Sequence, residues 1–170
     1  MKDVRPTSGK VLQALFNILG DINGLEFLDL FAGTGRVGLE ALKRGAKSCV
    51  FVESIKQRAD AIKKLLPDSL ILSLEVRRAV NMLVKRGMKF DVIFADPPYN
   101  SGWCDEILKI QNLEKLFNDD CVFVMEHSSR EKFETNDGSF ELISCREYGE
   151  TYLSFVKAVR SEKNFFSVPQ

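Results

Sequence analysis

The chain has 170 residues, of which 45% are apolar and 10% aromatic, and its 24 Lys and Arg residues balance its 24 Asp and Glu residues. This length fits one domain, and the apolar content is enough for a full hydrophobic core, so an intrinsically disordered chain is excluded. Because the formal net charge is zero, the molecule has no overall field that would attract a polyanion, and any nucleic-acid site must be a local patch.

The cysteines and the apolar runs indicate the compartment. Cys49, Cys104, Cys121 and Cys145 form no CxxC pair, and no histidine is close enough in sequence to suggest a zinc site. Reduced, mostly buried thiols are typical of cytoplasmic proteins. No run approaches the roughly 18 apolar residues of a membrane span, and the first residues contain no apolar core of a signal peptide. We therefore expect a cytoplasmic protein with no membrane segment and no metal.

Helices and strands are expected to alternate along the chain. Apolar residues at helical spacing predict a first helix over 8–19, with Gly20 beyond its end. Strands are then expected at 25–31, 48–53, 70–76, 90–95 and 121–126, separated by helices at 37–44, 55–66, 79–86 and 103–117. This alternation implies right-handed crossovers and a parallel sheet covered on both faces.

The end of the chain departs from this alternation. Residues 139–145 and 151–158 are both strand-like, and the five residues REYGE between them are too few for a helical crossover, so they should pair antiparallel. We expect an α/β fold: a doubly wound, mostly parallel, seven-stranded Rossmann-like sheet that ends in an antiparallel hairpin. The domain prediction is a single domain over 1–170, with an N-terminal segment and helix at 1–20, a catalytic core at 21–165 and a tail at 166–170.

A glycine-rich turn, DLFAGTGRVG, follows the first predicted strand. Gly33, Gly35 and Gly38 have the GxGxxG spacing that lets backbone approach a nucleotide cofactor. Glu53, at the end of the second strand, could hold two ribose hydroxyls. Asp29, beside the loop, would repel a pyrophosphate but suits an ammonium or a sulfonium. The pattern favours S-adenosylmethionine over NAD; the alternative is a structural turn with a helix-capping acid.

The fourth predicted strand is followed directly by four residues that we call the tetrad: Asp96, Pro97, Pro98 and Tyr99. The exocyclic amine of a nucleobase is a poor nucleophile, because its lone pair is delocalised into the ring. If Asp96 and the Pro97 carbonyl each accept one N–H, the lone pair can face a methyl donor, and the carboxylate stabilises the cation that forms. The prolines stiffen the backbone, and Tyr99 offers a flat face to an extruded base. An ordinary Asp-Pro-Pro turn is the alternative. It is less favoured, because the tetrad and the glycine loop would both lie at the carboxyl edge of the sheet, where open α/β sheets bind ligands.

The sequence leaves three lesser features open. One is a basic cluster that suits an RNA patch or a solvated face equally well: Arg77, Arg78, Lys85, Arg86 and Lys89. His127, at the end of the fifth strand, is more simply a structural histidine than a general base. Trp103 is most simply part of a helix core, and contact with a substrate base near Tyr99 is the alternative.

Six stretches of the sequence match those of a known family. They are RPTS at 5–8, ALFNIL at 14–19, FLDLFAGTGRVGLEAL at 27–42, VE at 52–53, FDVIFADPPY at 90–99 and YGETYLSF at 148–155. Together they resemble the RsmD family of bacterial small-subunit rRNA methyltransferases, which methylate the N2 amino group of a guanine in 16S rRNA. Where that family commonly has an acidic or amide residue after the third strand, this chain has Arg77 and Arg78.

The resemblance implies a Rossmann-like methyltransferase that uses S-adenosyl-L-methionine and acts, as a monomer, on 16S rRNA or the assembling small subunit. It implies a set of cofactor-binding residues: Thr7, Asp29, Phe31, Ala32, Gly33, Gly35, Glu53, Ser54, Arg78 and Ala79. Catalysis is assigned to Asp96, Pro97, Pro98 and Tyr99, and substrate contacts to Arg5, Tyr99 and Trp103. The same tetrad would suit adenine N6 in DNA or RNA, and an NAD-linked oxidoreductase is the alternative from another class.

Overall fold

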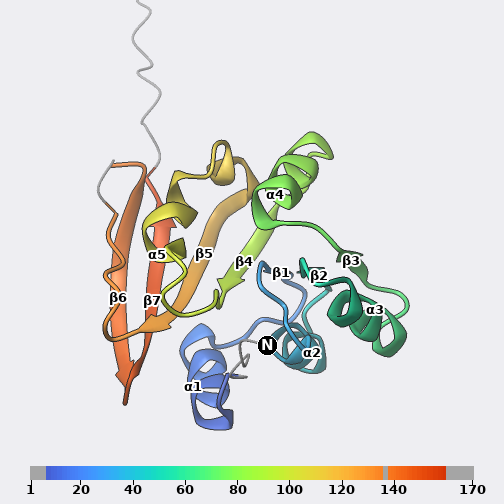
Figure 1. Cartoon of the computed structure of the whole chain (residues 1–170), viewed down its shortest axis with the longest axis horizontal. Helices are drawn as coiled ribbons and strands as arrows, with labels where there is room; N and C mark the ends of the chain where they lie inside the picture. The colour runs from blue at the N-terminus through green and yellow to red at the C-terminus, as the bar shows by residue number, and fades with distance from the viewer. Residues whose placement is uncertain (1–6, 136–137, 160–170) are drawn as a thin grey trace, which may run out of the picture.

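A seven-stranded sheet runs through the part of the chain that the computed structural model describes, residues 7–135 and 138–159 (Figure 1). Its strands are β1 Glu26–Asp29, β2 Ser48–Val52, β3 Leu70–Leu72, β4 Phe90–Ala95, β5 Phe117–Ser128, β6 Phe140–Tyr148 and β7 Thr151–Ala158. They lie in the order β3-β2-β1-β4-β5-β7-β6. Neighbouring strands from β3 to β5 are parallel, whereas β7 is antiparallel to both β5 and β6. The predicted α/β fold with its antiparallel terminal hairpin is therefore confirmed.

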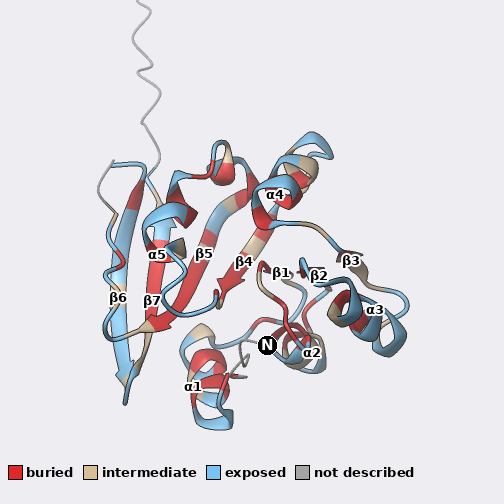
Figure 2. Ribbon diagram, viewed as in Figure 1, coloured by how far each residue is buried: buried red, intermediate tan, exposed pale blue. Residues whose placement is uncertain are grey.

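Helices cover both faces of the sheet. They are α1 Gly9–Leu19, α2 Arg36–Lys43, α3 Lys56–Leu65, α4 Val76–Lys85 and α5 Trp103–Glu106, and α5 is followed by the short 3₁₀ helices η1 Ile107–Lys109 and η2 Leu113–Leu116. Apolar residues of α1, α2 and α3 belong to one buried cluster, and those of α4, α5, η1 and η2 to the other. The strands between the two clusters are buried, whereas the edge strand β6 is largely exposed (Figure 2).

The first helix is fixed by its caps and by one apolar stripe. Ser8 Oγ accepts the N–H of Val11 at 3.2 Å, and Gly20 follows the helix with a φ of 72°. The buried stripe has the helical spacing that the sequence predicted: Val11, Leu12, Leu15 and Phe16. Because this helix is anchored on the sheet, the residue just before its cap, Thr7, lies at the edge where β4 and β5 end.

The strand order reverses at β1, which lies between β2 and β4. Asp29, the last residue of β1, is opposite Phe51 of β2 and Phe94 of β4. The connections that leave these strands turn to opposite faces of the sheet, and open α/β sheets bind their ligands at such a point. The predicted glycine loop and the predicted tetrad therefore begin at the same edge.

The sequence prediction is wrong at the third strand and the helix after it. The strand ends at Leu72 rather than at residue 76, and the helix begins at Val76 rather than at residue 79. Glu75 caps this helix, because its carboxylate accepts the N–H of Arg77 at 3.0 Å. The alternation in LILSLEV resembles a strand, yet its last residue begins a helical stripe of Val76, Ala79, Val80 and Leu83.

The predicted helix over 103–117 is also wrong: it is the four-residue α5 followed by the two 3₁₀ helices, with Asn112 at a φ of 65° between them. Leu108 and Phe117 are buried in this segment, and five further buried residues recur every third position: Cys104, Ile107, Ile110, Leu113 and Leu116. A repeat of three is the period of a 3₁₀ helix, not of an α-helix. The fifth strand is longer than the predicted 121–126, because it begins at Phe117 and runs to Ser128.

Candidate functional site

The glycine loop joins β1 to α2. Gly33 and Gly35 have φ values of 56° and 80°, in the left-handed region that suits glycine, and Gly35 is the N-cap of α2. At Gly38 a glycine is required for a different reason, which is close packing. A Cβ there would lie 2.3 Å from Phe51 Cε1 and 2.6 Å from Cys49 Sγ, so the absence of a side chain lets α2 pack directly on β2. Two glycines shape the turn, and the third sets the helix against the sheet.

Glu53 holds this loop from the next strand. It is buried, and its Oε2 accepts the N–H of Gly33 at 2.8 Å while its Oε1 accepts the N–H of Ile55 at 2.8 Å. A carboxylate has about four acceptor positions, so two backbone N–H groups leave acceptor capacity for ligand hydroxyls. The predicted cofactor residue therefore also has a structural role, which is to fix the backbone that approaches the ligand.

Asp29 is a buried carboxylate at the end of β1. It is 1% exposed, and among the residues that the structure describes neither of its oxygens has a partner at hydrogen-bonding geometry, although the backbone N–H groups of Gly38 and Phe31 lie close enough to lower its pKa. Burial is the larger effect and, with the charges of Glu53 and Glu126, raises the pKa of Asp29 to about 7. Because an unpartnered buried acid is unfavourable, a cationic ligand at this position would satisfy it.

Asp96 lies beside a second acid, Glu126, with Thr7 between them. The Thr7 hydroxyl oxygen is 3.2 Å from Asp96 Oδ2 and 2.9 Å from Glu126 Oε2. In the β4–β5 ladder Ala95 is opposite Met125, so the two acids follow at the same level. Burial and the neighbouring charge of Glu126 hold the pKa of Asp96 well above its usual range, and burial likewise raises the pKa of Glu126.

Thr7 is held in place by the first residue of α2. The Arg36 guanidinium donates to the Thr7 carbonyl oxygen at 2.8 Å, and Thr7 is buried. The segment before α1 is therefore attached to both the glycine loop and the tetrad. Arg5, the other residue assigned from this segment, lies outside the described residues.

The rest of the tetrad forms the outer wall of this corner. Pro97 is buried, whereas Pro98 and Tyr99 are exposed. The Tyr99 hydroxyl is 3.2 Å from Thr151 Oγ1 at the start of β7, and the N–H of Asn100 donates to Glu131 Oε1 at 2.9 Å. Contacts to the terminal hairpin and to the loop before it thus hold the exposed end of the tetrad.

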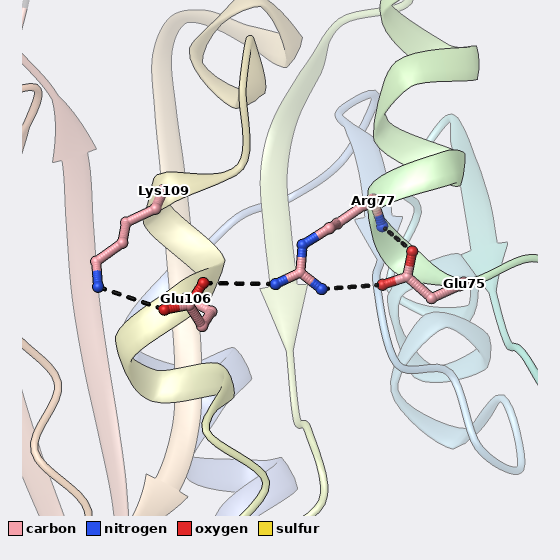
Figure 3. A network of polar contacts seen from close by, with 4 residues as sticks. All are labelled: Glu75, Arg77, Glu106 and Lys109. Atoms are coloured by element: carbon pink, nitrogen blue, oxygen red, sulfur yellow. Dashed lines mark hydrogen bonds and ion pairs between the residues drawn. The ribbon is translucent and has the colours of Figure 1, made fainter.

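Trp103 packs against the glycine loop. Its ring meets that of Phe31 edge to face with centroids 5.2 Å apart, and the Arg77 guanidinium lies over it at 4.6 Å. Arg77 also joins the start of α4 to α5, because it pairs with Glu75 at 3.4 Å and with Glu106 at 3.5 Å (Figure 3). These ion pairs are half exposed and contribute little stability, but the Arg77 guanidinium also packs on the Trp103 ring, which lies against Phe31 of the glycine loop.

The structure brings together some of the predicted site residues and not others. The edge gathers Thr7, Asp29, Phe31, Ala32, Gly33, Gly35, Glu53, Asp96, Pro97, Tyr99 and Trp103. Ser54 is exposed directly after Glu53, Arg78 is exposed on α4, and Ala79 is fully buried in the core. Since β3 ends early, the acid that follows it is Glu75, and the expected departure at Arg77 and Arg78 arose from the misplaced strand end.

Sequence reasoning did not assign Glu126 to the site, and it favoured a structural role for His127, which agrees with the contacts of that side chain. Glu126 stands inside an apolar strand, and a carboxylate in such a run was the available signal. His127 points away from the acids: its Nε2 is 2.8 Å from Ser154 Oγ and its Nδ1 is 3.1 Å from the Ser128 carbonyl oxygen. Burial lowers the pKa of His127, which therefore stays neutral and structural.

All four cysteines are free thiols, and each except Cys145 is buried. Over residues 7–135 and 138–159, no group of three His, Cys, Asp or Glu side chains is arranged to hold a metal ion. No helix in the same ranges has the length and apolar character to cross a membrane.

Comparison with known proteins places this geometry in a family. The family model described as conserved hypothetical protein 95 matches residues 1–157. A Bacillus subtilis protein named "Putative rRNA methyltransferase YlbH" is 30% identical over 160 residues, which are 90% of this chain and 87% of that protein. The ribosomal RNA small subunit methyltransferase D of Haemophilus influenzae is 36% identical over 115 residues, which are 63% of this chain and 59% of that enzyme. A solved hypothetical protein of Thermus thermophilus has a TM-score of 0.75 at 26% identity, covering 91% of this chain and 89% of that one.

Proposed function

The chain is a methyltransferase of the conserved hypothetical protein 95 family, the RsmD family, and from that membership we propose that it methylates the N2 amino group of a guanine in 16S rRNA. The methyl donor in this proposal is S-adenosylmethionine, and the guanine is of the position-966 type. The substrate is the free rRNA or the assembling small subunit, and the protein acts as a monomer in the cytoplasm, where such an RNA is made.

One observation carries this proposal: a buried carboxylate, which has no hydrogen-bond partner within residues 7–135 and 138–159, lies next to a turn that brings backbone to the same edge. Asp29 fits the cofactor, because the ammonium would satisfy both its charge and its oxygens, and the sulfonium would satisfy its charge. Gly33 and Gly35 let backbone approach the cofactor, and Glu53 has acceptor positions left for its ribose hydroxyls. When bound, S-adenosylmethionine supplies an electrophilic methyl group.

The tetrad binds and activates the amine that receives this methyl group. Asp96 and the Pro97 carbonyl each accept one N–H, which draws the nitrogen towards a tetrahedral shape and frees its lone pair. The Asp96 carboxylate then stabilises the cation that forms on the nitrogen. Tyr99 offers its exposed ring to an extruded base, and such stacking contributes roughly 1 to 3 kcal/mol, part of what extrusion costs.

Two other functions are alternatives for the same residues. An adenine-N6 methyltransferase of DNA or RNA would use the tetrad in the same way, because both amines donate two N–H groups. An NAD-linked oxidoreductase would place a pyrophosphate near the glycine loop, where the unpartnered Asp29 disfavours an anion. We therefore prefer the methyltransferase and let the product decide between guanine and adenine.

A transfer assay tests the proposal. Purified protein is incubated with labelled S-adenosylmethionine and small-subunit rRNA from cells that lack this gene, either naked or in particles, and the modified nucleoside is identified by mass spectrometry. We expect one N2-methylguanosine. Labelled N6-methyladenosine would establish the alternative methyltransferase, and NADH binding without S-adenosylmethionine binding would overturn the assignment.

The catalytic assignment needs a matched pair of variants. Asp96→Asn removes the carboxylate charge and should lower the transfer rate roughly 100- to 1000-fold, as loss of one preorganised electrostatic group does elsewhere. Asp60→Asn makes the same change at an exposed position, where Asp60 pairs with Lys56 along α3, and should leave the rate unchanged. Equal rates for the two variants would remove Asp96 from the chemistry.

A further inference from the structure

Two contacts between side-chain oxygens link three residues in a row, Asp96, Thr7 and Glu126, and each contact needs a hydrogen between its oxygens. The hydroxyl oxygen of Thr7 is within 3.2 Å of one carboxylate and 2.9 Å of the other, yet it carries a single hydrogen. If both acids are ionised, one of these contacts has no hydrogen between its oxygens. If one acid is protonated, that acid donates to the hydroxyl and the hydroxyl donates to the other acid, so both contacts become hydrogen bonds.

The surroundings favour one shared proton. Glu126 is buried, and Asp29 adds a further acid from β1 to the same corner. In the described ranges no Lys, Arg or His side chain pairs with any of these three acids, and Arg36, the cation that contacts Thr7, is directed at its backbone carbonyl. Like charges this close cannot all ionise without a cation, as paired carboxylates in other sites show.

Resting on the proposed methyl transfer, we propose that Glu126 is a positioning residue: through the Thr7 hydroxyl it keeps a proton beside Asp96, and this proton leaves when a sulfonium binds. Before binding, the pair Asp96–Glu126 holds one proton. The arriving positive charge takes the place of the proton's charge, the acid O–H bond breaks, and the proton passes to the solvent. Asp96 is then ionised when it must accept the N–H of an amine.

The arrangement also discriminates between the two forms of the cofactor. The methylated form carries a positive sulfur, whereas S-adenosylhomocysteine carries a neutral thioether and the same ammonium. Only the first can displace the shared proton, because the ammonium is common to both and Asp29 already suits it. With the neutral product bound, the Asp96–Glu126 pair should therefore hold its proton again, taken from the solvent, so that the product binds with less proton release than the methylated form.

Calorimetry counts such protons without any turnover. The wild-type protein is titrated near pH 7 with S-adenosylmethionine and with S-adenosylhomocysteine, in buffers of different ionisation enthalpy, and the dependence of the heat on the buffer gives the protons released. We expect the methylated form to release more protons than the demethylated form, by up to about one per molecule. The ratio of the two affinities should rise with pH, by at most about tenfold per pH unit.

A pair of glutamate variants assigns the proton. Glu126→Gln should remove the difference in proton release between the two ligands, since Asp96 then has no acidic neighbour on β5. Glu141→Gln, an exposed site on β6, should leave it unchanged. Equal proton release by both ligands in the wild type would overturn the inference even if the variant failed to fold, and an unchanged difference in a folded Glu126→Gln protein would do the same. Failure of both ligands to bind would instead refute the proposed function.

Discussion

Glu53 holds the amide of Gly33 across a connection between two strands: its Oε2 accepts that N–H at 2.8 Å, and its Oε1 accepts the N–H of Ile55. One buried side chain thus ties the loop after β1 to the turn after β2. The backbone that would approach a cofactor is held by a residue that the cofactor itself would touch, so binding and local stability depend on the same carboxylate.

A Glu53→Gln variant tests whether this carboxylate holds both backbone N–H groups. Glutamine has one acceptor oxygen, so one of the two backbone N–H groups would face an amide donor and lose its bond. We expect a loss of about 1 to 3 kcal/mol in the free energy of unfolding, measured in urea, and weaker binding of S-adenosylhomocysteine. Glu40→Gln is the control, because Glu40 pairs with Arg44 within α2 and its C-cap in a partly exposed i,i+4 ion pair, and its loss should cost about 0.5 kcal/mol or less. Similar losses in both variants would show that Glu53 does not hold the loop.

Two glycines give a matched test of packing. Gly38→Ala would place a methyl group 2.3 Å from Phe51 Cε1 inside a buried contact, and we expect it to destabilise the protein by about 1 to 3 kcal/mol as α2 moves from β2. Gly9→Ala in α1 meets only Arg36 Nη2 at 3.4 Å and should be neutral or stabilising by up to about 1 kcal/mol. Thermal unfolding of the two variants decides this, and a stable Gly38→Ala protein would contradict the close approach.

The sequence predicted the helices and strands correctly where the apolar residues recur with a single clear period. Apolar runs bounded by glycine predicted the parallel strands, and a five-residue connection predicted the terminal hairpin. The errors came where two periods compete. LILSLEV alternates like a strand but ends in a helix cap at Glu75, and the segment after Trp103 repeats every three residues, too short a period for the α-helix that was expected.

The sequence pattern by itself indicated those parts of the candidate site whose residues lie in a local motif. The loop at Gly33–Gly35 and the strand end at Asp96 are local signals, and the sheet order brings them together. Glu126 could not be assigned in this way, because its place beside Asp96 depends on the register of β4 against β5. Contact of Thr7 with both acids depends in turn on how α1 is anchored, which no local pattern states.

The unpartnered Asp29 predicts how stability changes with pH. Its pKa is raised to about 7 in the folded protein, so between about pH 4 and pH 7 the folded state binds more protons than the unfolded chain. The free energy of unfolding should therefore fall as the pH rises through this range, by up to about 1.4 kcal/mol per pH unit from this group. The raised pKa values of Asp96 and Glu126 act in the same direction.

Asp29→Asn should remove this group's share of the pH dependence. The variant is expected to be more stable than the wild type near about pH 8, with a difference that shrinks towards about pH 5, and to bind S-adenosylmethionine more weakly because the carboxylate is lost. Urea unfolding at both pH values gives the first result and calorimetry the second. Parallel curves for variant and wild type would mean that folding does not raise the pKa of Asp29.

Trp103 offers a direct reading of the loop, because it is the single tryptophan of the chain. Its ring touches Phe31 of the glycine loop on one side and the Arg77 guanidinium on another. A ligand that contacts the loop should change the environment of this ring, so we expect a saturable change in its emission as S-adenosylhomocysteine is added. Arg77→Met should shift the emission of the free protein but preserve the response, since it leaves Phe31 in place. A silent tryptophan under conditions where calorimetry detects binding would mean that the ligand does not reach this side of the loop.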